Sequence, residues 1–262
     1  MFAHTSKWVT VGIQGALTLL AVLFAVPLVL MIGISLQGRG FDNYVAILTH
    51  PLIPRFFLNS AIVSFCTISI VYVATSLAAY AFSKLELKGK TVLFNLILLG
   101  MMIPAVSLIV PLFITVKKLH MIDSYLSLIG PYTALTLPFT LLLMRNFLDE
   151  LPNQLLDAAK IDGCGTFQTY VHIIVPLTKP IAVVVVIWTF LSSWNEYFMP
   201  LVFMQSESMR VITQAPQFFT GQYSQDTGKV FASLVLISLP VTVAYLSMQK
   251  FFEDGMTAGS IK

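Results

Sequence analysis

Residues 151–163 read LPNQLLDAAKIDG, a short polar stretch in a chain whose other segments are mostly apolar. Pro152 can open a helix here, and Asn153 can help to cap it. Gly163 or Gly165 can then end the helix in a left-handed conformation. The stretch therefore predicts a short helix, and the segments on either side of it decide the fold to which that helix belongs.

The composition of the 262-residue chain is typical of an integral membrane protein. The chain is 57% hydrophobic and only 10% charged, whereas soluble domains carry about 25% charged residues. Its net charge of +3 gives no clustered basic surface for a nucleic-acid partner. Cys66 lies in an apolar run and Cys164 in a polar one, so we expect no disulfide framework.

Charge-free apolar runs long enough to cross a bilayer recur along the chain. About 20 apolar residues suffice for one helical span, and a helix satisfies its own backbone groups in lipid. The alternating segments of about ten residues that indicate a β-barrel are not found. We therefore expect an all-α membrane protein, a single transmembrane domain over residues 1–262 with six helices. The expected spans are about 9–36, 58–83, 91–116, 125–144, 180–204 and 230–249.

The Lys and Arg residues set the expected orientation of these spans. With the N-terminus in the cytoplasm, nine of the 15 Lys and Arg residues fall in inside segments. This excess predicts that both termini are cytoplasmic. The basic turn of Lys84, Lys88 and Lys90 then also lies inside, where we expect it to fix orientation and contact lipid headgroups rather than form a specific site.

The loop of residues 145–179 joins the fourth and fifth spans and carries the quoted helix. Connections in helix bundles are usually about 2–8 residues long, so this loop is unusually long. Leu155, Ala159 and Gly163 fall on one face of the helix, and their small bulk lets a partner approach the backbone closely. Two interpretations remain open for this helix, a docking surface for another protein or an amphipathic helix on the membrane interface.

No pattern in the chain indicates catalysis or metal binding. A P-loop needs G-x-x-x-x-G-K-[ST], and Lys84 occupies the first glycine position before Gly89–Thr91. A metal centre needs clustered ligands, and an intramembrane serine protease needs a histidine inside a span. The four histidines are instead scattered over loops and the tail, at His4, His50, His120 and His172. We therefore expect no enzyme and no metal site.

Glu196 is the one acidic residue inside an expected span. A charge at mid-bilayer costs about 2.5–3.5 kcal/mol, so such residues face a bundle interior or water. At about 1.5 Å per residue from Pro180, Glu196 is expected in the outer half of the membrane. It is a candidate for lining a translocation path, and a helix-bending or subunit-interface cluster is the alternative. The candidate path residues are Asn59, Trp194, Asn195, Glu196 and Tyr197.

A spaced pattern runs through the loop, where DAAKIDG at 157–163 is followed after nine residues by IIVP at 173–176. It resembles the pattern E-A-A-x-x-x-G, then nine residues, then I-x-L-P, of the permease subunits of binding-protein-dependent ABC importers. Asp157 stands where Glu is usual, and Val175 where Leu is usual. The shorter carboxylate of Asp157 reaches less far toward a partner than Glu does.

Further stretches resemble the carbohydrate branch of that family, the relatives of the maltose permease pair. Together they cover the chain from about Asn43 to Lys262 and occur in the family's order. They are NSAIVSF at 59–65, AAYAFSKL at 78–85, MMIPAVSLIVPLF at 101–113, WNEYFMPLVF at 194–203 and DGMTAGSIK at 254–262.

The resemblance implies a type I ABC importer permease fold, in which the loop helix is a cytoplasmic coupling helix. It implies a heterodimer with a second homologous permease subunit, two ATPase subunits that use ATP and Mg, and an extracytoplasmic binding protein that delivers sugar. It places the chain in the bacterial inner membrane and gives it no cofactor of its own. The residues implied in ATPase coupling are Leu155, Asp157, Ala158, Ala159, Asp162, Gly163 and Pro176.

On this resemblance the expected substrate is a sugar or oligosaccharide, and two alternatives stay open. Glycerol-3-phosphate or another polyol is the first, although a phosphate favours Arg or Lys facing the pore and no span interior holds one. An ion-coupled secondary transporter is the second. Such proteins usually show internal repeats and ionisable residues at mid-membrane, and only Glu196 fits that description.

Overall fold

The computed structural model describes residues 7–220 and 226–258, and side chains from Trp8 to Gln249 within those ranges. Of the family-like tail at 254–262, residues 259–262 therefore lie outside the described residues. Every regular element in the described chain is a helix. The chain divides into two units, Met1–Ile53 with Ala215–Ser238 and Pro54–Gln214 with Leu239–Lys262.

The first unit contains α1 (Lys7–Ser35), α2 (Asp42–Leu48) and the first turns of α12 (Thr227–Ala258). α1 is apolar on all sides, and nearly all of its described side chains are exposed, as suits a helix surrounded by lipid or another apolar surface. The turn between α1 and α2 is held by Asn43, whose Nδ2 donates to the carbonyl oxygens of Ser35 and Gln37 at 2.9 Å each.

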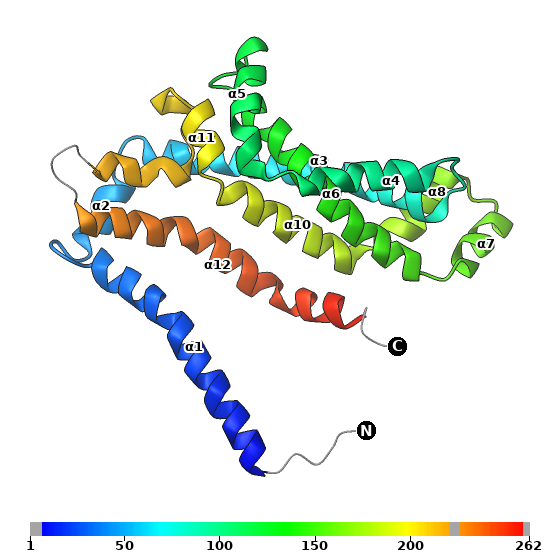
Figure 1. Ribbon diagram of the computed structural model, residues 1–262, viewed down its shortest axis with the longest axis horizontal. Helices are drawn as coiled ribbons and strands as arrows, with labels where there is room; N and C mark the ends of the chain where they lie inside the picture. The colour runs from blue at the N-terminus through cyan, green and yellow to red at the C-terminus, as the bar shows by residue number, and fades with distance from the viewer. Residues whose placement is uncertain (1–6, 221–225, 259–262) are drawn as a thin grey trace. The chain divides into compact units, whose positions relative to one another are not determined.

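The second unit carries the remaining elements, arranged as in Figure 1. They are α3 (Ile53–Lys84), α4 (Lys90–Leu99), η1 (Gly100–Met102), η2 (Ala105–Leu108), α5 (Ile109–Lys118), α6 (Leu126–Glu150), α7 (Gln154–Ile161), α8 (Thr166–Thr169), the π-helix η3 (Tyr170–Ile174), α9 (Val175–Leu177), α10 (Lys179–Trp194), α11 (Phe198–Phe203) and η4 (Glu207–Met209). The 3-10 helix η5 (Ile212–Phe219) begins in this unit.

Four helical stretches in the described residues are long and apolar enough to cross a membrane, and two bent pairs raise the number to as many as six. One bent pair is Lys90–Met102 with Ala105–Lys118, at 90°, and the other is Thr166–Leu177 with Lys179–Trp194, at 77°. The four uninterrupted stretches are Trp8–Ser35, Ile53–Lys84, Leu126–Glu150 and Thr227–Gln249.

Two of the expected spans are not continuous helices. The run 91–116 breaks at Ile103 and Pro104, which are extended with ψ values of 119° and 126°. Pro104 has no N–H to donate, and it disfavours helical geometry in the residue before it. The run 180–204 also breaks, because α10 ends at Trp194 and α11 begins at Phe198.

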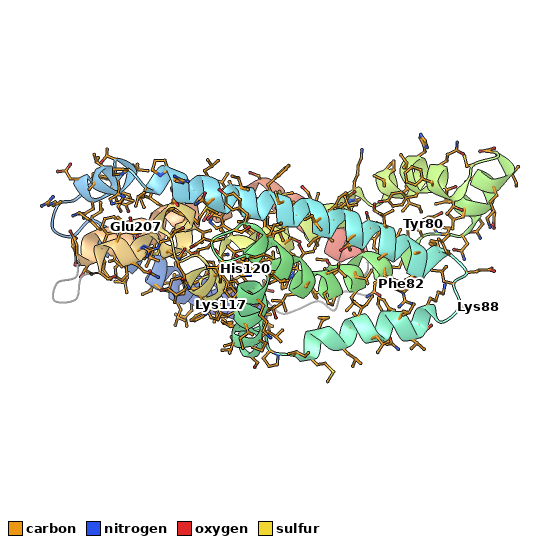
Figure 2. The ribbon with its side chains drawn as sticks, turned by 90° about the horizontal axis from the view of Figure 1, so that it is seen from above. Tyr80, Phe82, Lys88, Lys117, His120 and Glu207 are labelled. Atoms are coloured by element: carbon orange, nitrogen blue, oxygen red, sulfur yellow. The ribbon has the colours of Figure 1, made fainter. Side chains whose placement is uncertain are left out.

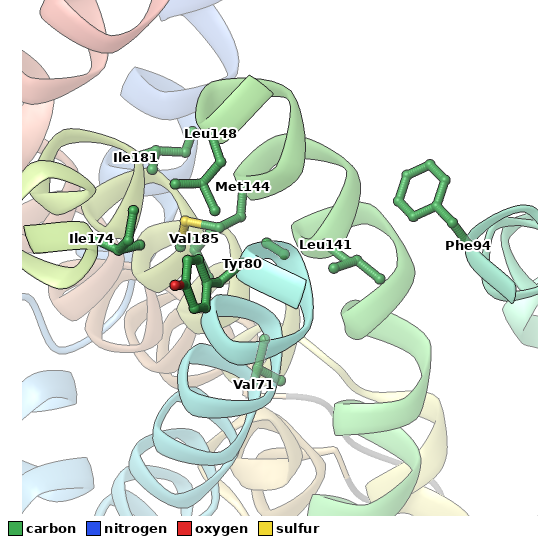
Figure 3. Close-up of a cluster of buried hydrophobic side chains, with 10 residues drawn as sticks. Val71, Tyr80, Phe94, Leu141, Met144, Leu148, Ile174, Ile181 and Val185 are labelled. Atoms are coloured by element: carbon green, nitrogen blue, oxygen red, sulfur yellow. The ribbon is translucent and has the colours of Figure 1, made fainter. Parts of the chain in front are cut away.

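Apolar side chains from α3, α4, α6, η3 and α10 form the main core of the second unit (Figure 3). Hydroxyl pairs join the same helices, since Thr75 bonds to Thr140 and Ser193 bonds to Ser64, each at 3.0 Å. Such pairs hold helices together where apolar burial alone gives little advantage in lipid. The core residues are Val71, Ala79, Tyr80, Phe94, Leu141, Met144, Leu148, Ile174, Ile181 and Val185.

Figure 2 shows that the basic turn at Lys88 lies at the end of the second unit that also carries the loop 145–179. Lys117, His120 and Glu207 lie away from that end. The α3–α4 turn and the long loop therefore emerge on the same side of this unit.

Candidate functional site

α7 is the short helix predicted from the quoted stretch, and it lies at the end of the second unit (Figure 1). The turn that follows it contains Gly163, whose φ is 79°. The amide of Gly163 donates to the Lys160 carbonyl oxygen at 3.1 Å, and the amide of Cys164 donates to the Ala159 carbonyl oxygen at 2.9 Å. This pair of bonds is a Schellman motif, which needs a left-handed residue and so favours glycine. Gly165 has a φ of −71° and instead precedes α8.

The face that α7 presents outward differs from the predicted one. Ala159 is only 2% exposed, so its side chain is covered by the chain itself and gives no direct contact surface. Ile161, the last residue of α7, is 87% exposed. The other implied coupling residues are also exposed: Leu155, Asp157, Ala158, Asp162, Gly163 and Pro176.

Lys84 ties the start of α7 to the end of α3. Its Nζ donates to the Leu151 carbonyl oxygen at 2.7 Å and to Asn153 Oδ1 at 3.0 Å. Asn153, predicted to help cap the helix, makes no side-chain cap bond, because its amide oxygen is occupied by the ammonium of Lys84. Nearby, Asp149 accepts a bond from Ser83 Oγ at 2.5 Å.

The second half of the loop leads into α10 through an irregular helix. Residues Tyr170–Ile174 form a π-helix directly before Pro176. Pro176 cannot donate to a carbonyl one turn earlier, which is a known cause of such a local widening. Tyr170 bonds through its hydroxyl to Ser76 on α3 at 2.6 Å, so both halves of the loop are attached to the same helix.

Two predicted path residues lie in the protein interior instead. Asn59 is 1% exposed, donates to the carbonyl oxygens of Ser208 and Arg210, and accepts from the Tyr125 hydroxyl. Trp194 is 5% exposed and packs against aromatic neighbours. Both side chains are therefore buried within the second unit, and their place in a translocation path stays a prediction.

Glu196 occupies the break between α10 and α11. Its Oε1 accepts from the backbone amides of Phe198 at 2.8 Å and Met199 at 3.1 Å. A carboxylate at this point satisfies the first amides of α11, which have no partners within the helix. This contact supports the helix-bending alternative for Glu196. Asn195 and Tyr197, on either side, are exposed.

Glu196 also lines a cavity of about 580 Å³ in the second unit. The cavity is bounded by the break at Gly100–Ala105, by α6 and by the C-terminal half of α10. The residues in its wall that are polar or aromatic are Tyr132, Thr136, Phe139, Trp188, Ser192 and Glu196. Of these, sequence reasoning had found only Glu196.

Within the described ranges, no group of three or more His, Cys, Asp or Glu side chains could hold a metal ion. Cys66 and Cys164 are both free thiols.

Residues 73–258 match a protein family described as the binding-protein-dependent transport system inner membrane component. The chain belongs to this family. One relative is permease protein AraQ of the arabinooligosaccharides transport system of Bacillus subtilis, 30% identical over 238 residues that cover 89% of this chain and 84% of that protein. Another is permease protein MalG of the trehalose/maltose transport system of Thermococcus litoralis, 32% identical over 226 residues that cover 84% and 81%.

A solved structure has the same fold. It is a bacterial ABC transporter involved in the import of the acidic polysaccharide alginate, matched with a TM-score of 0.82 at 20% identity. The match covers 96% of this permease and 99% of that chain. The permease is thus an all-α membrane component with the fold of ABC importer permeases, and its family consists of transport components rather than enzymes.

Proposed function

We propose that the permease is one transmembrane subunit of an ATP-driven importer of a sugar or oligosaccharide. The transport systems of the two relatives are named for arabinooligosaccharides and for trehalose and maltose, and both cover most of this chain. Membership of a binding-protein-dependent family argues against the ion-coupled alternative. No observation favours glycerol-3-phosphate, because the cavity wall holds no Lys or Arg.

The observation that carries the proposal is the exposed helix α7. It ends in a glycine-dependent turn at Gly163, and it offers Ile161 and Leu155 as apolar contacts beside the carboxylates of Asp157 and Asp162. An ATPase subunit can seat this helix in a cleft and move it when ATP binds. Ala159 supports the helix from its inner side, and Pro176 directs the chain back toward α10.

The proposed assembly contains this permease, a second homologous permease, two ATPase subunits and an extracytoplasmic binding protein. ATP and Mg are bound by the ATPase subunits, since the permease chain has no P-loop. We propose that both termini are cytoplasmic. The basic turn at Lys88 supports this orientation, because it lies at the same end as α7 and Lys and Arg favour the cytoplasmic side.

Transport in liposomes tests the proposal. The permease is co-purified with its companion subunits and reconstituted, and uptake of labelled maltose, trehalose and arabinotriose is measured with the binding protein outside. We expect uptake that requires ATP and the ATPase subunits. Uptake driven by an ion gradient with the ATPase subunits absent would show the proposal to be wrong.

A further inference from the structure

The cavity at Glu196 has the composition of a small-molecule site. Its volume of about 580 Å³ lies within the range of roughly 300–1,000 Å³ found for such sites, which are mostly apolar with a few placed polar groups. Glu196 is the single charged residue in the wall. A neutral ligand with several hydroxyl groups fits this set better than an anionic one.

Two helix breaks meet at this cavity. The extended residues Ile103 and Pro104 line it, and Glu196 comes from the break between α10 and α11. Irregular backbone at membrane depth is tolerated only where it is buried in protein or lines a water-filled space. Discontinuous helices of this kind form the substrate sites of many transporters. The break at Pro104 therefore indicates a hydrated cavity that a polar ligand can enter.

The wall offers an aromatic surface beside hydrogen-bonding groups. Trp188 is 43% exposed, and its ring packs against Phe139 with centroids 4.4 Å apart, so the indole is held in place. Ser192 follows Trp188 by four residues, which puts both on one side of α10, and Glu196 lines the same cavity from the break that follows α10. An apolar ring face next to hydroxyl and carboxylate groups matches the two faces of a sugar ring.

The side chain of Tyr132 gives a second, independent indication that the cavity holds a ligand. It lines the cavity and is 5% exposed, yet its hydroxyl has no hydrogen-bond partner among the described residues. Buried polar groups in native proteins are nearly always paired, so an unpaired hydroxyl in a cavity wall points to a partner from outside the chain. Glu196 uses only Oε1 for the amides of α11, which leaves Oε2 for a ligand.

We infer that this subunit itself holds a neutral sugar ring during transport, in the cavity where the two helix breaks meet. Trp188 is the stacking surface, and Tyr132, Ser192 and Glu196 are the hydrogen-bonding groups. The inference rests on the proposed function and adds to it that the substrate touches this permease and not only its partner permease. It also assigns the selectivity for neutral over acidic sugars to the sole carboxylate of the wall.

The inference is tested with the complete transporter reconstituted in liposomes. Uptake is measured for maltose, trehalose, arabinotriose and an alginate-derived acidic disaccharide, and ATP hydrolysis is measured in the same preparations. Ser192→Phe fills the cavity and Trp188→Leu removes the stacking surface. We expect each to lower uptake of the neutral sugar by at least about tenfold, the effect of one lost good contact. Stimulation of ATP hydrolysis by the loaded binding protein should stay near the wild-type level.

Tyr132→Phe removes only the unpaired hydroxyl and so threatens folding least. It should raise the KM for uptake or change the ratio of rates between the neutral sugars, an effect that a purely structural tyrosine would not have. Ser247→Phe and Phe65→Leu are matched controls at exposed positions outside the wall, and they should transport like wild type.

The outcomes separate this inference from the proposed function. If the wild type imports a neutral sugar and the cavity variants keep its rates and selectivity, the inference is wrong and the proposed function stands. The inference is equally wrong if uptake falls only in proportion to the complex recovered, because the cavity is then a subunit interface. If the wild type imports no sugar with ATP, the proposed function itself is wrong.

Discussion

Gly228→Ala is expected to destabilise the permease because there is no space for the added methyl group. A Cβ at Gly228 would lie 2.5 Å from the Gln37 carbonyl oxygen and 2.6 Å from Asn43 Nδ2. Real Cβ atoms essentially never approach heavy atoms within 3.0 Å. Either α12 or the turn that follows α1 must therefore move, because the Gln37 carbonyl and the Asn43 side-chain amide both occupy the space.

The magnitude follows from what Asn43 holds. Its Nδ2 makes two 2.9 Å bonds to backbone oxygens, and each is worth about 0.5–1.5 kcal/mol. Overpacking adds about 1–3 kcal/mol, and the better helix propensity of alanine returns at most about 1 kcal/mol. The net loss is then on the order of 1–5 kcal/mol, which lowers the melting temperature by at least about 2 °C in a chain of this length.

Heating the purified transporter and measuring the fraction of permease that stays in the monodisperse complex gives this melting temperature. Gly130→Ala is the matched control, since nothing lies within 4 Å of its Cβ position, and it should be neutral or slightly stabilising. The losses from Gly228→Ala and Asn43→Ala should not add, because both break the same bonds. A wild-type melting temperature in Gly228→Ala, or full additivity, would refute the reasoning.

Three further predictions concern the loop and the start of α12. Gly163→Trp adds a bulky side chain at a residue whose φ is 79°, which should distort the turn after α7 and keep the helix from seating on the ATPase subunit. Uptake should therefore fall while ATP hydrolysis continues. Lys84→Met removes both bonds to the start of α7, a loss of about 1–2 kcal/mol at this partly exposed site, and should weaken coupling in the same assays. Asp226→Asn should destabilise the protein near neutral pH, because a hydrogen bond from Lys229 lowers the pKa of this carboxyl below 3.8. That stabilisation is complete above pH 3.8 and is lost as the pH falls through the lower folded-state pKa.

Each of these has a control. Gly165→Trp adds the same bulk at a residue with negative φ outside α7, and equal uptake in both tryptophan variants would contradict a docking role for Gly163. Lys84→Arg keeps the cation and should retain coupling. For Asp226, thermal unfolding of wild type and Asp226→Asn from pH 7 to pH 3 gives the answer, and a constant difference over this range would contradict the linkage.

The charge-free runs predicted most of the long helices, but they did not predict where two of the expected spans break. Pro27, Pro138 and Pro240 lie inside continuous helices, whereas the helix breaks at Pro104. Pro138 is buried among neighbouring helices, which hold α6 together. Pro27 is exposed in a continuous helix, and the residues around Pro104 are also exposed, so exposure alone does not decide which helix breaks. Whether a proline interrupts its helix therefore cannot be deduced from the proline alone.

The candidate site was partly predictable for a similar reason. Glu196 was predicted because it is the lone acid in an apolar run. Trp194 was predicted only because it lies two residues from Glu196 in the sequence, and its side chain is buried. Helical spacing would have selected Ser192 and Trp188 instead, at four and eight residues before Glu196. Tyr132 lies on another helix, and its contribution to the cavity depends on how α6 packs against α10.

The broken backbone at Ile103 and Pro104 limits how firmly a passing molecule can be retained. The Ile103 amide donates to the Gly100 carbonyl oxygen at 3.4 Å, and the Pro104 carbonyl oxygen accepts from the Ser107 amide at 3.0 Å, so the Ile103 carbonyl oxygen is the backbone group left for water or a solute. One such hydrogen bond contributes about 0.5–1.5 kcal/mol. Residence is therefore short, as conduction demands, because a passage that gripped its cargo would stall. A helix that ran straight through this point would have been dry, and a polar solute crossing it would have had to shed its hydration with nothing in return.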